Sequence, residues 1–347
     1  ITDMNEVATL IPNVSINTDF YAMYIRGIGT AEANVLAEQA IGFIVDGVYL
    51  ARIEFLRPGF IDVERMEVLR GPQGTLFGRN SPAGVINITL GRPDYEWHAR
   101  ASAQYGELSD LDTRGMVNIP IIDDKIALRL SGSYGSRDGH TENTFKGSPN
   151  KRIGDRDQTA VRAKLRFDLT DNFDVTLNGA WFDYNFQTWA RTEQFNTPFE
   201  FETLFKTHDP NFESNLDRRG SEREGSQAIG DGYITSIDMN LEIWDHTITS
   251  TSSYAAYYDD SGGDTEGASF PLMEFGFAND FWQAAQEIRL TSPPGDIEYV
   301  AGLFGFKSVS DAVGYGHILR DTDPAFLQTV AIPEALQPLV TSVFDLL

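Results

Sequence analysis

Strict alternation of apolar and polar residues is the feature that most limits what this chain can fold into. In one segment Val161, Ala163, Leu165, Phe167 and Leu169 alternate with charged residues at positions 162, 164, 166 and 168. Such alternation predicts a β-strand with one apolar and one polar face. A strand of this length, when tilted, can cross a lipid bilayer. The pattern therefore favours a transmembrane β-barrel.

Similar segments recur along the chain, and we expect them to form nine antiparallel strands. These lie at about 97–107, 110–121, 125–136, 157–169, 172–186, 232–243, 246–258, 280–291 and 297–309. Their connections alternate between short ones and long ones, the long ones at about 137–156, 187–231, 259–279 and 310–347. Short turns at one end and long loops at the other are typical of an outer-membrane barrel. A soluble β-sandwich, the alternative fold, has no reason to keep its long loops at one end.

Residues 1–94 follow a different pattern and are expected to form a separate α+β domain, with residues 95–347 forming the barrel part. The first segment has short apolar runs between Gly-rich turns and no long alternating stretch. Asp3 can cap a short helix that runs through Leu10 and is ended by Pro12. Asp46-Gly47 predicts a hairpin turn between two apolar runs.

Four runs in this domain carry a family resemblance. They are Ile25–Gly29, Val45–Tyr49, Val63–Pro72 and Gly74–Asn87. In this order and spacing they resemble the plug-domain signature of TonB-dependent outer-membrane receptors. The resemblance implies an α+β plug inside the lumen of a barrel. Because a plugged lumen is associated with about 22 strands, the nine expected here would be an incomplete barrel whose C-terminal part is missing. No run matches a TonB box, so we expect that segment to be absent as well.

The resemblance also implies site residues. In such receptors plug arginines pair with glutamates of the inner barrel wall, and the matching positions are Arg26 and Arg70. Alternation in the segment around residue 287 points Glu287 into the lumen, so we expect these three residues to form an ionic lock. Ligand contacts come from the apical plug loops, here about 28–40 and 50–60. Glu32, Asn34 and Arg52 are the polar candidates in them.

Aromatic residues cluster near the loop ends of two predicted strands. They are Trp181, Phe182, Tyr184, Phe186, Trp189, Tyr254, Tyr257 and Tyr258. We expect a membrane-interface girdle, and stacking against a sugar or a siderophore is the alternative.

Composition excludes several classes of protein. The chain has no cysteine, which excludes disulfide scaffolds and thiolate metal sites, and its formal net charge of −24 argues against nucleic-acid binding. No apolar run is long enough for a transmembrane helix. The five histidines show no ligand spacing, and no catalytic motif is present, so we expect no metal site, no catalytic residues, no cofactor and no enzymatic activity.

The resemblance therefore implies a function in transport. We expect import of a scarce ligand across the bacterial outer membrane, most simply a ferric siderophore or another iron complex. The expected partners are the TonB–ExbB–ExbD energy-coupling system, outer-membrane lipid and the small-molecule ligand. Import of carbohydrate, cobalamin or another nutrient remains open, as does a structural or partner-binding role in the outer membrane.

Overall fold

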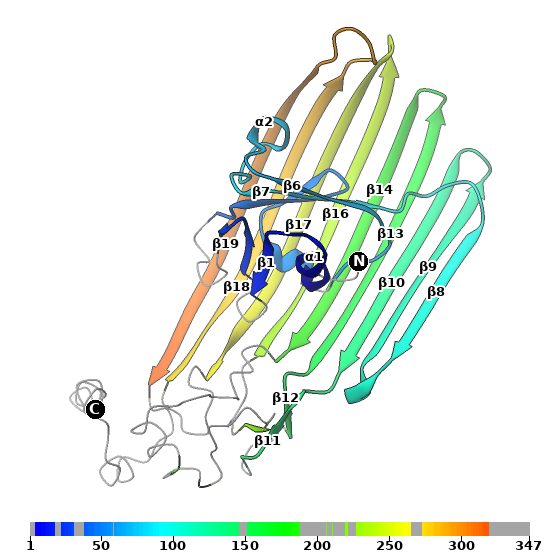
Figure 1. Ribbon diagram of the computed structural model, residues 1–347. Helices are drawn as coiled ribbons and strands as arrows, with labels where there is room; N and C mark the ends of the chain where they lie inside the picture. Colours follow the sequence, from blue (N-terminus) through cyan, green and yellow to red (C-terminus); the bar gives the residue numbers. More distant parts are fainter. Residues whose placement is uncertain are drawn as a thin grey trace.

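The computed structural model describes residues 4–17, 22–30, 38–57, 59–145, 151–187, 206, 210, 219–220, 227–264 and 273–318. Figure 1 shows a small α+β unit lying in front of one wide sheet of long strands. We call the unit formed by residues 4–90 the plug and the nine-stranded sheet the wall. Within the described ranges, no helix is long and apolar enough to span a membrane.

The wall is an antiparallel sheet in which sequence neighbours pair throughout. Its order is β19-β18-β17-β16-β14-β13-β10-β9-β8. The strands are β8 (His98–Tyr105), β9 (Leu111–Ile122), β10 (Ile126–Arg137), β13 (Arg156–Thr170), β14 (Phe173–Phe186), β16 (Gln227–Ile243), β17 (His246–Asp264), β18 (Met273–Thr291) and β19 (Val300–Ile318). Nine antiparallel strands were predicted, and nine are present in this sheet.

Connections at the two ends of the wall differ as expected. At one end the strands are joined across residues 123–125, 171–172, 244–245 and 292–299. We call this the short-turn end and the opposite one the long-loop end. At the long-loop end lies a small sheet of β11 (Thr141–Asn143), β12 (Arg152–Ile153) and β15 (Arg219–Gly220), which falls within segments predicted as loops.

Strands β17, β18 and β19 are longer than alternation predicted. The connection expected at 259–279 is largely strand, because β17 continues to Asp264 and β18 begins at Met273 in unbroken register. Glycines and aspartates at 259–264 hide the apolar pattern. Asp259 and Ser261 are nevertheless buried on the inner face. Because these buried positions are polar, the alternation of apolar and polar residues that would predict a strand is absent here.

The described residues of the plug form two small sheets and three short helices. One sheet has the order β1-β2-β3, from Val14–Asn17, Ala22–Ile25 and Ile28–Thr30. The other has the order β5-β4-β7-β6, from Val48–Leu50, Ile41–Val45, Gly84–Leu90 and Val63–Arg70, with β4 and β7 parallel. The helices are α1 (Met4–Leu10), the 3-10 helix η1 (Ile53–Leu56) and α2 (Gly74–Phe77).

Local sequence explains two of these elements. Helix α1 ends before Pro12, as predicted. Asp46 and Gly47 both have positive φ, of 51° and 80°, which is the geometry of a two-residue hairpin turn between β4 and β5. The border between the two domains remains a proposal at 94/95; β7 ends at Leu90 and β8 begins at His98.

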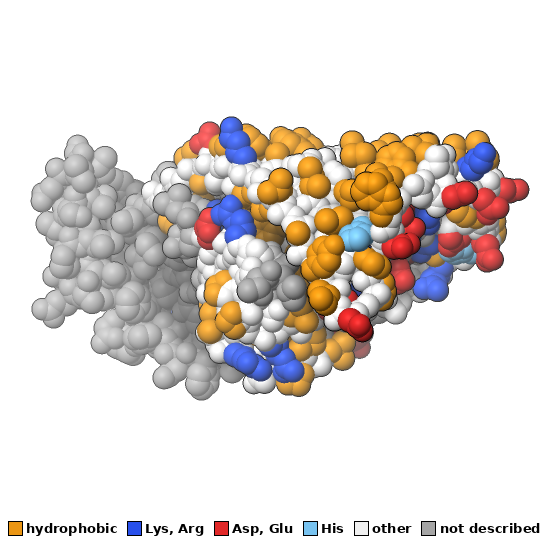
Figure 2. All heavy atoms as spheres, turned by 90° about the horizontal axis from the view of Figure 1, so that it is seen from above, with side chains coloured by type: hydrophobic (Ala, Val, Ile, Leu, Met, Phe, Trp, Pro, Cys, Tyr) orange, Lys and Arg blue, Asp and Glu red, His pale blue; other side chains and the backbone are white. Residues whose placement is uncertain are grey.

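Side chains of the wall divide cleanly between its two faces. Large apolar residues such as Leu130, Val161, Trp181, Tyr233 and Ile237 are exposed on the outer face. In Figure 2, viewed from the short-turn end, hydrophobic side chains line the upper edge, which is this outer face. The plug covers the inner face of the middle strands, and the core lies between them, whereas β8 and β19 have no buried residues among those described. Phe55 of η1 contacts the rings of Phe182, Tyr257 and Phe281 at centroid distances of 6.4, 5.0 and 6.0 Å.

Candidate functional site

Asp62 of the plug is held by Arg129 of β10 in a two-point ion pair. Nε and Nη2 of Arg129 donate to the two carboxylate oxygens at 2.6 and 2.7 Å. The side chains are only 10% and 13% exposed. Gly91 lies against the guanidinium, and a Cβ at this position would come within 2.5 Å of Arg129. A bidentate pair with little access to water is a strong and directional contact.

A second pair joins the β4–β5 turn of the plug to β13. Nζ of Lys164 lies 2.7 Å from Oδ2 of Asp46 and also donates to the carbonyl oxygens of Leu90 and Gly91 at 3.3 and 3.0 Å. The other oxygen of Asp46 accepts a hydrogen bond from the Leu90 amide at 2.9 Å. The ammonium group therefore donates two hydrogen bonds to backbone carbonyls and forms a close ion pair with Asp46, whose Oδ2 makes no hydrogen bond within the described part of the chain.

Towards the long-loop end, the plug contributes the cation and the wall contributes the carboxylate. Arg57, just after η1, donates through Nη1 to Asp259 of β17 at 2.9 Å, and the two side chains are 1% and 4% exposed. The Tyr184 hydroxyl and the Ser261 hydroxyl also donate to Asp259. The Arg57 guanidinium lies 5.2 Å from the centre of the Tyr184 ring. The Asp259 carboxylate is thus stabilised by three hydrogen-bond donors of the protein in place of water.

The uncharged side chain of Gln283 on β18 also joins the wall to the plug, through two hydrogen bonds. The Gln283 amide donates to the Tyr49 carbonyl at 2.6 Å and accepts from the Ala51 amide at 2.9 Å. The side chain is 1% exposed. A buried amide that satisfies two backbone groups fixes the position of the β5 end against the wall.

Glu54 in η1 is a buried acid among these contacts. It is 5% exposed, and its Oε2 has no hydrogen-bond partner in the described part of the chain. Burial raises the pKa of the Glu54 carboxyl to about 7, and the charge of Asp259 acts in the same direction. Its own backbone, Arg52 and a hydrogen bond from Tyr257 oppose the rise. Near neutral pH this carboxyl therefore exchanges a proton while enclosed between plug and wall.

A polar cavity of about 790 Å³ lies between the plug and the inner face nearer the short-turn end. It begins at the Asp46–Lys164 pair and extends along β14, β16, β17 and β18 to β19. Its lining combines hydroxyl, amide and charged side chains, among them Thr176, Asn178, Asp238, Asn240, Thr249, Thr251, Glu287 and Arg289. Among the described residues, no group of three His, Asp or Glu side chains could hold a metal ion.

The three residues of the predicted ionic lock lie in different places. Glu287 lines the polar cavity, in agreement with its predicted inward position, and its Oε1 lies 3.7 Å from Nη1 of Arg289. Arg70 donates to the Pro12 carbonyl at 3.4 Å. Arg26 is exposed in the β2–β3 turn with φ of 53°. The structure brings neither arginine to Glu287 within the described ranges, and their pairing stays a prediction.

Of the predicted ligand contacts, Glu32 and Asn34 lie outside the described residues. Arg52 directly precedes η1, and its guanidinium carbon lies 5.5 Å from the centre of the Phe281 ring. Its role as a ligand contact stays a prediction.

Trp189 lies outside the described residues, and the rest of the aromatic cluster divides between the two faces of the wall. Trp181, Tyr254 and Tyr258 are exposed on the outer face, where a girdle would lie. Phe182, Tyr184, Phe186 and Tyr257 are buried on the inner face. Assigning all of them to a girdle was wrong for these four, because adjacent residues of a strand point to opposite faces.

Sequence reasoning missed the residues that do join plug and wall: Asp46, Arg57, Asp62, Arg129, Lys164, Asp259 and Gln283. The polar face of the segment at 157–169 already contained Lys164. Its partner could not be identified, because nothing local in the sequence relates position 164 to position 46.

Comparison with known proteins gives a family for the N-terminal part. Residues 1–85 match the family model described as TonB-dependent Receptor Plug Domain. The pesticin receptor of Yersinia pestis is 32% identical over 98 residues, which are 27% of this chain and 14% of that receptor. The catecholate siderophore receptor Fiu of Escherichia coli is 31% identical over 111 residues, which are 32% of this chain and 13% of that receptor.

Solved structures extend the likeness to the wall. The ferric yersiniabactin uptake receptor FyuA from Yersinia pestis superposes with a TM-score of 0.71 at 17% identity, covering 90% of this chain and 47% of that one. The ferripyoverdine receptor of Pseudomonas aeruginosa gives a TM-score of 0.67 at 15% identity, covering 93% and 42%. The chain therefore spans less than half the length of these receptors and shares their outer-membrane fold, with a plug seated against part of a barrel.

Replacing Asp62 tests the first ion pair. Asp62→Asn keeps a side chain suited to the positive φ of 58° at this position but leaves Arg129 without its counter-charge. We expect the plug to lose about 3 kcal/mol of its attachment, as when a buried pair is broken. Cells that make the full-length receptor should then become more sensitive to a large antibiotic that the outer membrane normally excludes.

The matched control is Arg65→Gln, which breaks the exposed Arg65–Glu67 pair, whose side chains are 64% and 43% exposed. It should change sensitivity little. Equal sensitivity in the two variants would contradict the assignment.

Glu54 predicts an unusual pH dependence. In the folded protein the pKa of this carboxyl is about 7, whereas the ordinary pKa of an exposed glutamate is 4.5. The folded state therefore binds more protons between these values, and stability falls as pH rises through this window, by at most about 3 kcal/mol. Thermal unfolding of the full-length receptor at pH 5 and pH 8 should show this fall. Glu54→Gln should flatten it, and Glu67→Gln should not; an unchanged slope in Glu54→Gln would refute the assignment.

Proposed function

We propose that this chain, a TonB-dependent receptor plug domain with part of its outer-membrane barrel, serves in the import of a ferric siderophore into a Gram-negative bacterium. The observation that carries the proposal is a plug with this family signature seated against the inner face of the wall by buried ion pairs. A plug held by paired charges and by the apolar cluster around Phe55 closes the barrel and can still be detached, because no covalent bond has to be broken.

The similar proteins named above support an iron complex as cargo. They include a catecholate siderophore receptor, a ferric yersiniabactin uptake receptor and a ferripyoverdine receptor. Catecholate, yersiniabactin and pyoverdine complexes differ widely in chemistry, so the shared feature is chelated iron rather than one ligand shape.

The geometry suggests how transport would proceed. Cargo would be captured at the long-loop end, which faces the outside of the cell in barrels of this kind. Arg52, Glu54 and Arg57 lie on the plug segment around η1 and contact the aromatic inner face through Phe281, Tyr257 and Tyr184. Displacement of this segment by cargo would disturb the Arg57–Asp259 pair and so loosen the plug. The polar cavity beyond would provide a hydrated route along β14, β16, β17 and β18.

The energy for release would come from the TonB–ExbB–ExbD system in the inner membrane. In this account the chain performs no covalent chemistry and is not an enzyme. Binding energy and mechanical work replace bond making and breaking.

Two other functions remain in competition. Import of carbohydrate, cobalamin or another nutrient would use the same plug and wall, because a fold does not fix its cargo. A structural role, in which the long loops bind other outer-membrane proteins, would not require the plug to move. The many breakable contacts between plug and wall favour transport over that role.

Abundance under iron limitation tests the choice of cargo. If the cargo is an iron complex, iron-starved cells of the source organism should contain several times more of the full-length protein in their outer membranes than iron-replete cells. Quantitative mass spectrometry of purified outer membranes measures this, with an abundant porin as the reference. Equal amounts in both conditions would rule against the siderophore proposal and direct the search to carbon sources or cobalamin.

A further inference from the structure

The free edge of the larger plug sheet meets the wall at Gln283 of β18. Strand β5 is an edge strand in the order β5-β4-β7-β6. Backbone groups of alternate residues point to opposite sides of a strand. The Tyr49 carbonyl and the Ala51 amide, which flank Leu50, therefore point to the same side. Both bind the Gln283 side chain, at 2.6 and 2.9 Å, so the wall satisfies groups that β4 does not reach.

The Gln283 side chain takes the place of a residue of a further strand. Its amide carries a donor and an acceptor, and they bind a carbonyl and an amide two residues apart, as one residue of a parallel strand would. Ala255, the residue opposite Gln283 on β17, is fully buried, and its small side chain lets β5 come this close. A shift of β5 by one residue would turn both groups away, so the two bonds fix its register against the wall.

The residues that follow β5, which we call the η1 segment (residues 52–57), contact successive inner positions of β18. The guanidinium carbon of Arg52 lies 5.5 Å from the centre of the Phe281 ring. Asn279, two residues further along the same face, donates to the Tyr257 hydroxyl at 3.0 Å, and Tyr257 bonds Glu54. The segment is therefore placed along β18 and β17 from the point at which Gln283 holds its start.

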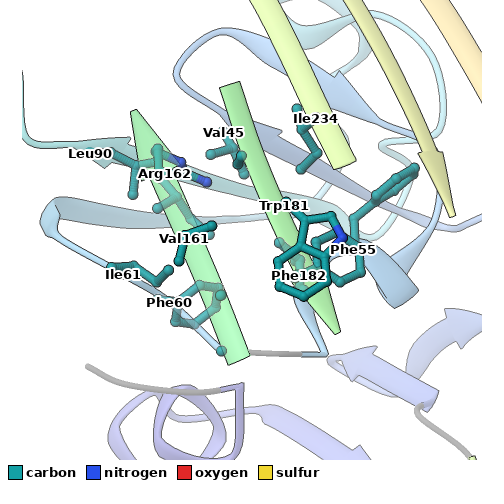
Figure 3. Close-up of a pocket in the computed structure, with 15 residues that line it drawn as sticks. Val45, Phe55, Phe60, Ile61, Leu90, Val161, Arg162, Trp181, Phe182 and Ile234 are labelled. Carbon is teal, nitrogen blue, oxygen red and sulfur yellow. The ribbon is translucent and has the colours of Figure 1, made fainter. Parts of the chain in front are cut away.

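Apolar packing does not set this position by itself. Figure 3 shows the neighbouring part of the interface, where Val45 and Phe55 of the plug line one small pocket with Phe182 and Ile234 of the wall. Burial of apolar surface is favourable but has no direction. It holds the η1 segment against the wall, whereas the two hydrogen bonds of Gln283 determine where along the strands the segment lies.

We propose that Gln283 is the positioning residue of the η1 segment. It sets the places of Arg52, Glu54 and Arg57 along β17 and β18, and through them the form of the plug surface that cargo would displace. The connection to cargo rests on the proposed import function, whereas the positioning of the segment does not.

Hydrogen exchange of single amides tests the positioning role without cargo. In the full-length receptor, Gln283→Leu keeps a side chain of similar size and removes both polar groups. The Ala51 amide should then exchange at least about tenfold faster, because its hydrogen bond is lost. The Leu50 amide, which belongs to the pairing of β5 with β4, should stay protected. Unchanged exchange at Ala51, or equal acceleration at Leu50, would overturn the proposal.

The matched control is Gln286→Leu on the same strand. Gln286 is exposed on the outer face and donates to Ser250 at 3.0 Å, so its loss should leave the Ala51 amide protected. The wild type supplies a test that needs no variant to fold. Its Ala51 amide, although at the edge of a sheet, should be protected from exchange, and an unprotected Ala51 amide would overturn the proposal.

Uptake kinetics test the consequence for cargo. Cells that make the full-length receptor would be supplied with iron bound to yersiniabactin, pyoverdine or citrate. For a complex that the wild type imports, Gln283→Leu should raise the KM of uptake several-fold and leave its maximal rate and the exclusion of a large antibiotic unchanged. An unchanged KM would overturn the connection between Gln283 and cargo. Absence of uptake of every complex by the wild type would count against the proposed function, and the Ala51 exchange would still decide the positioning role.

Discussion

The plug is attached to the wall by charges that have almost no access to water, and every one of them has to be compensated inside the interface. Asp62 with Arg129, Asp46 with Lys164 and Arg57 with Asp259 meet this requirement. Each pair is strong while it is enclosed, yet water stabilises the separated charges as soon as the plug moves. This combination allows one interface to seal a barrel and still open.

The pairs also divide the interface into two regions. Near the short-turn end, acids of the plug meet cations of β10 and β13, whereas near the long-loop end a plug arginine meets an acid of β17. Between these anchors and β19 lies the polar cavity. Detaching the Arg57 end would free the segment around η1 while the β10 and β13 pairs still hold the plug. Full displacement of the plug would then require that the Asp62–Arg129 and Asp46–Lys164 pairs break as well.

Alternation in the sequence predicted the strands, their antiparallel order and the inward position of Glu287, because these depend only on the period of two along each strand. Alternation did not predict the ends of β17 and β18 at the long-loop end. The buried positions there, such as Asp259, are polar and contact polar groups. The ion pairs could not be predicted at all. Asp62 and Arg129 are separated by 67 residues, and Arg57 and Asp259 by 202, so only the folded arrangement of plug and wall determines which charges meet.

Uptake of radioactive iron tests the account most directly. Cells that make the full-length receptor would be supplied with iron bound to yersiniabactin, pyoverdine, alcaligin, citrate or a catecholate, with and without a functional TonB protein. The account predicts that at least one complex enters the cells, only when both the receptor and TonB are present. Iron entry that is the same in cells with and without the receptor, for every complex, would contradict it.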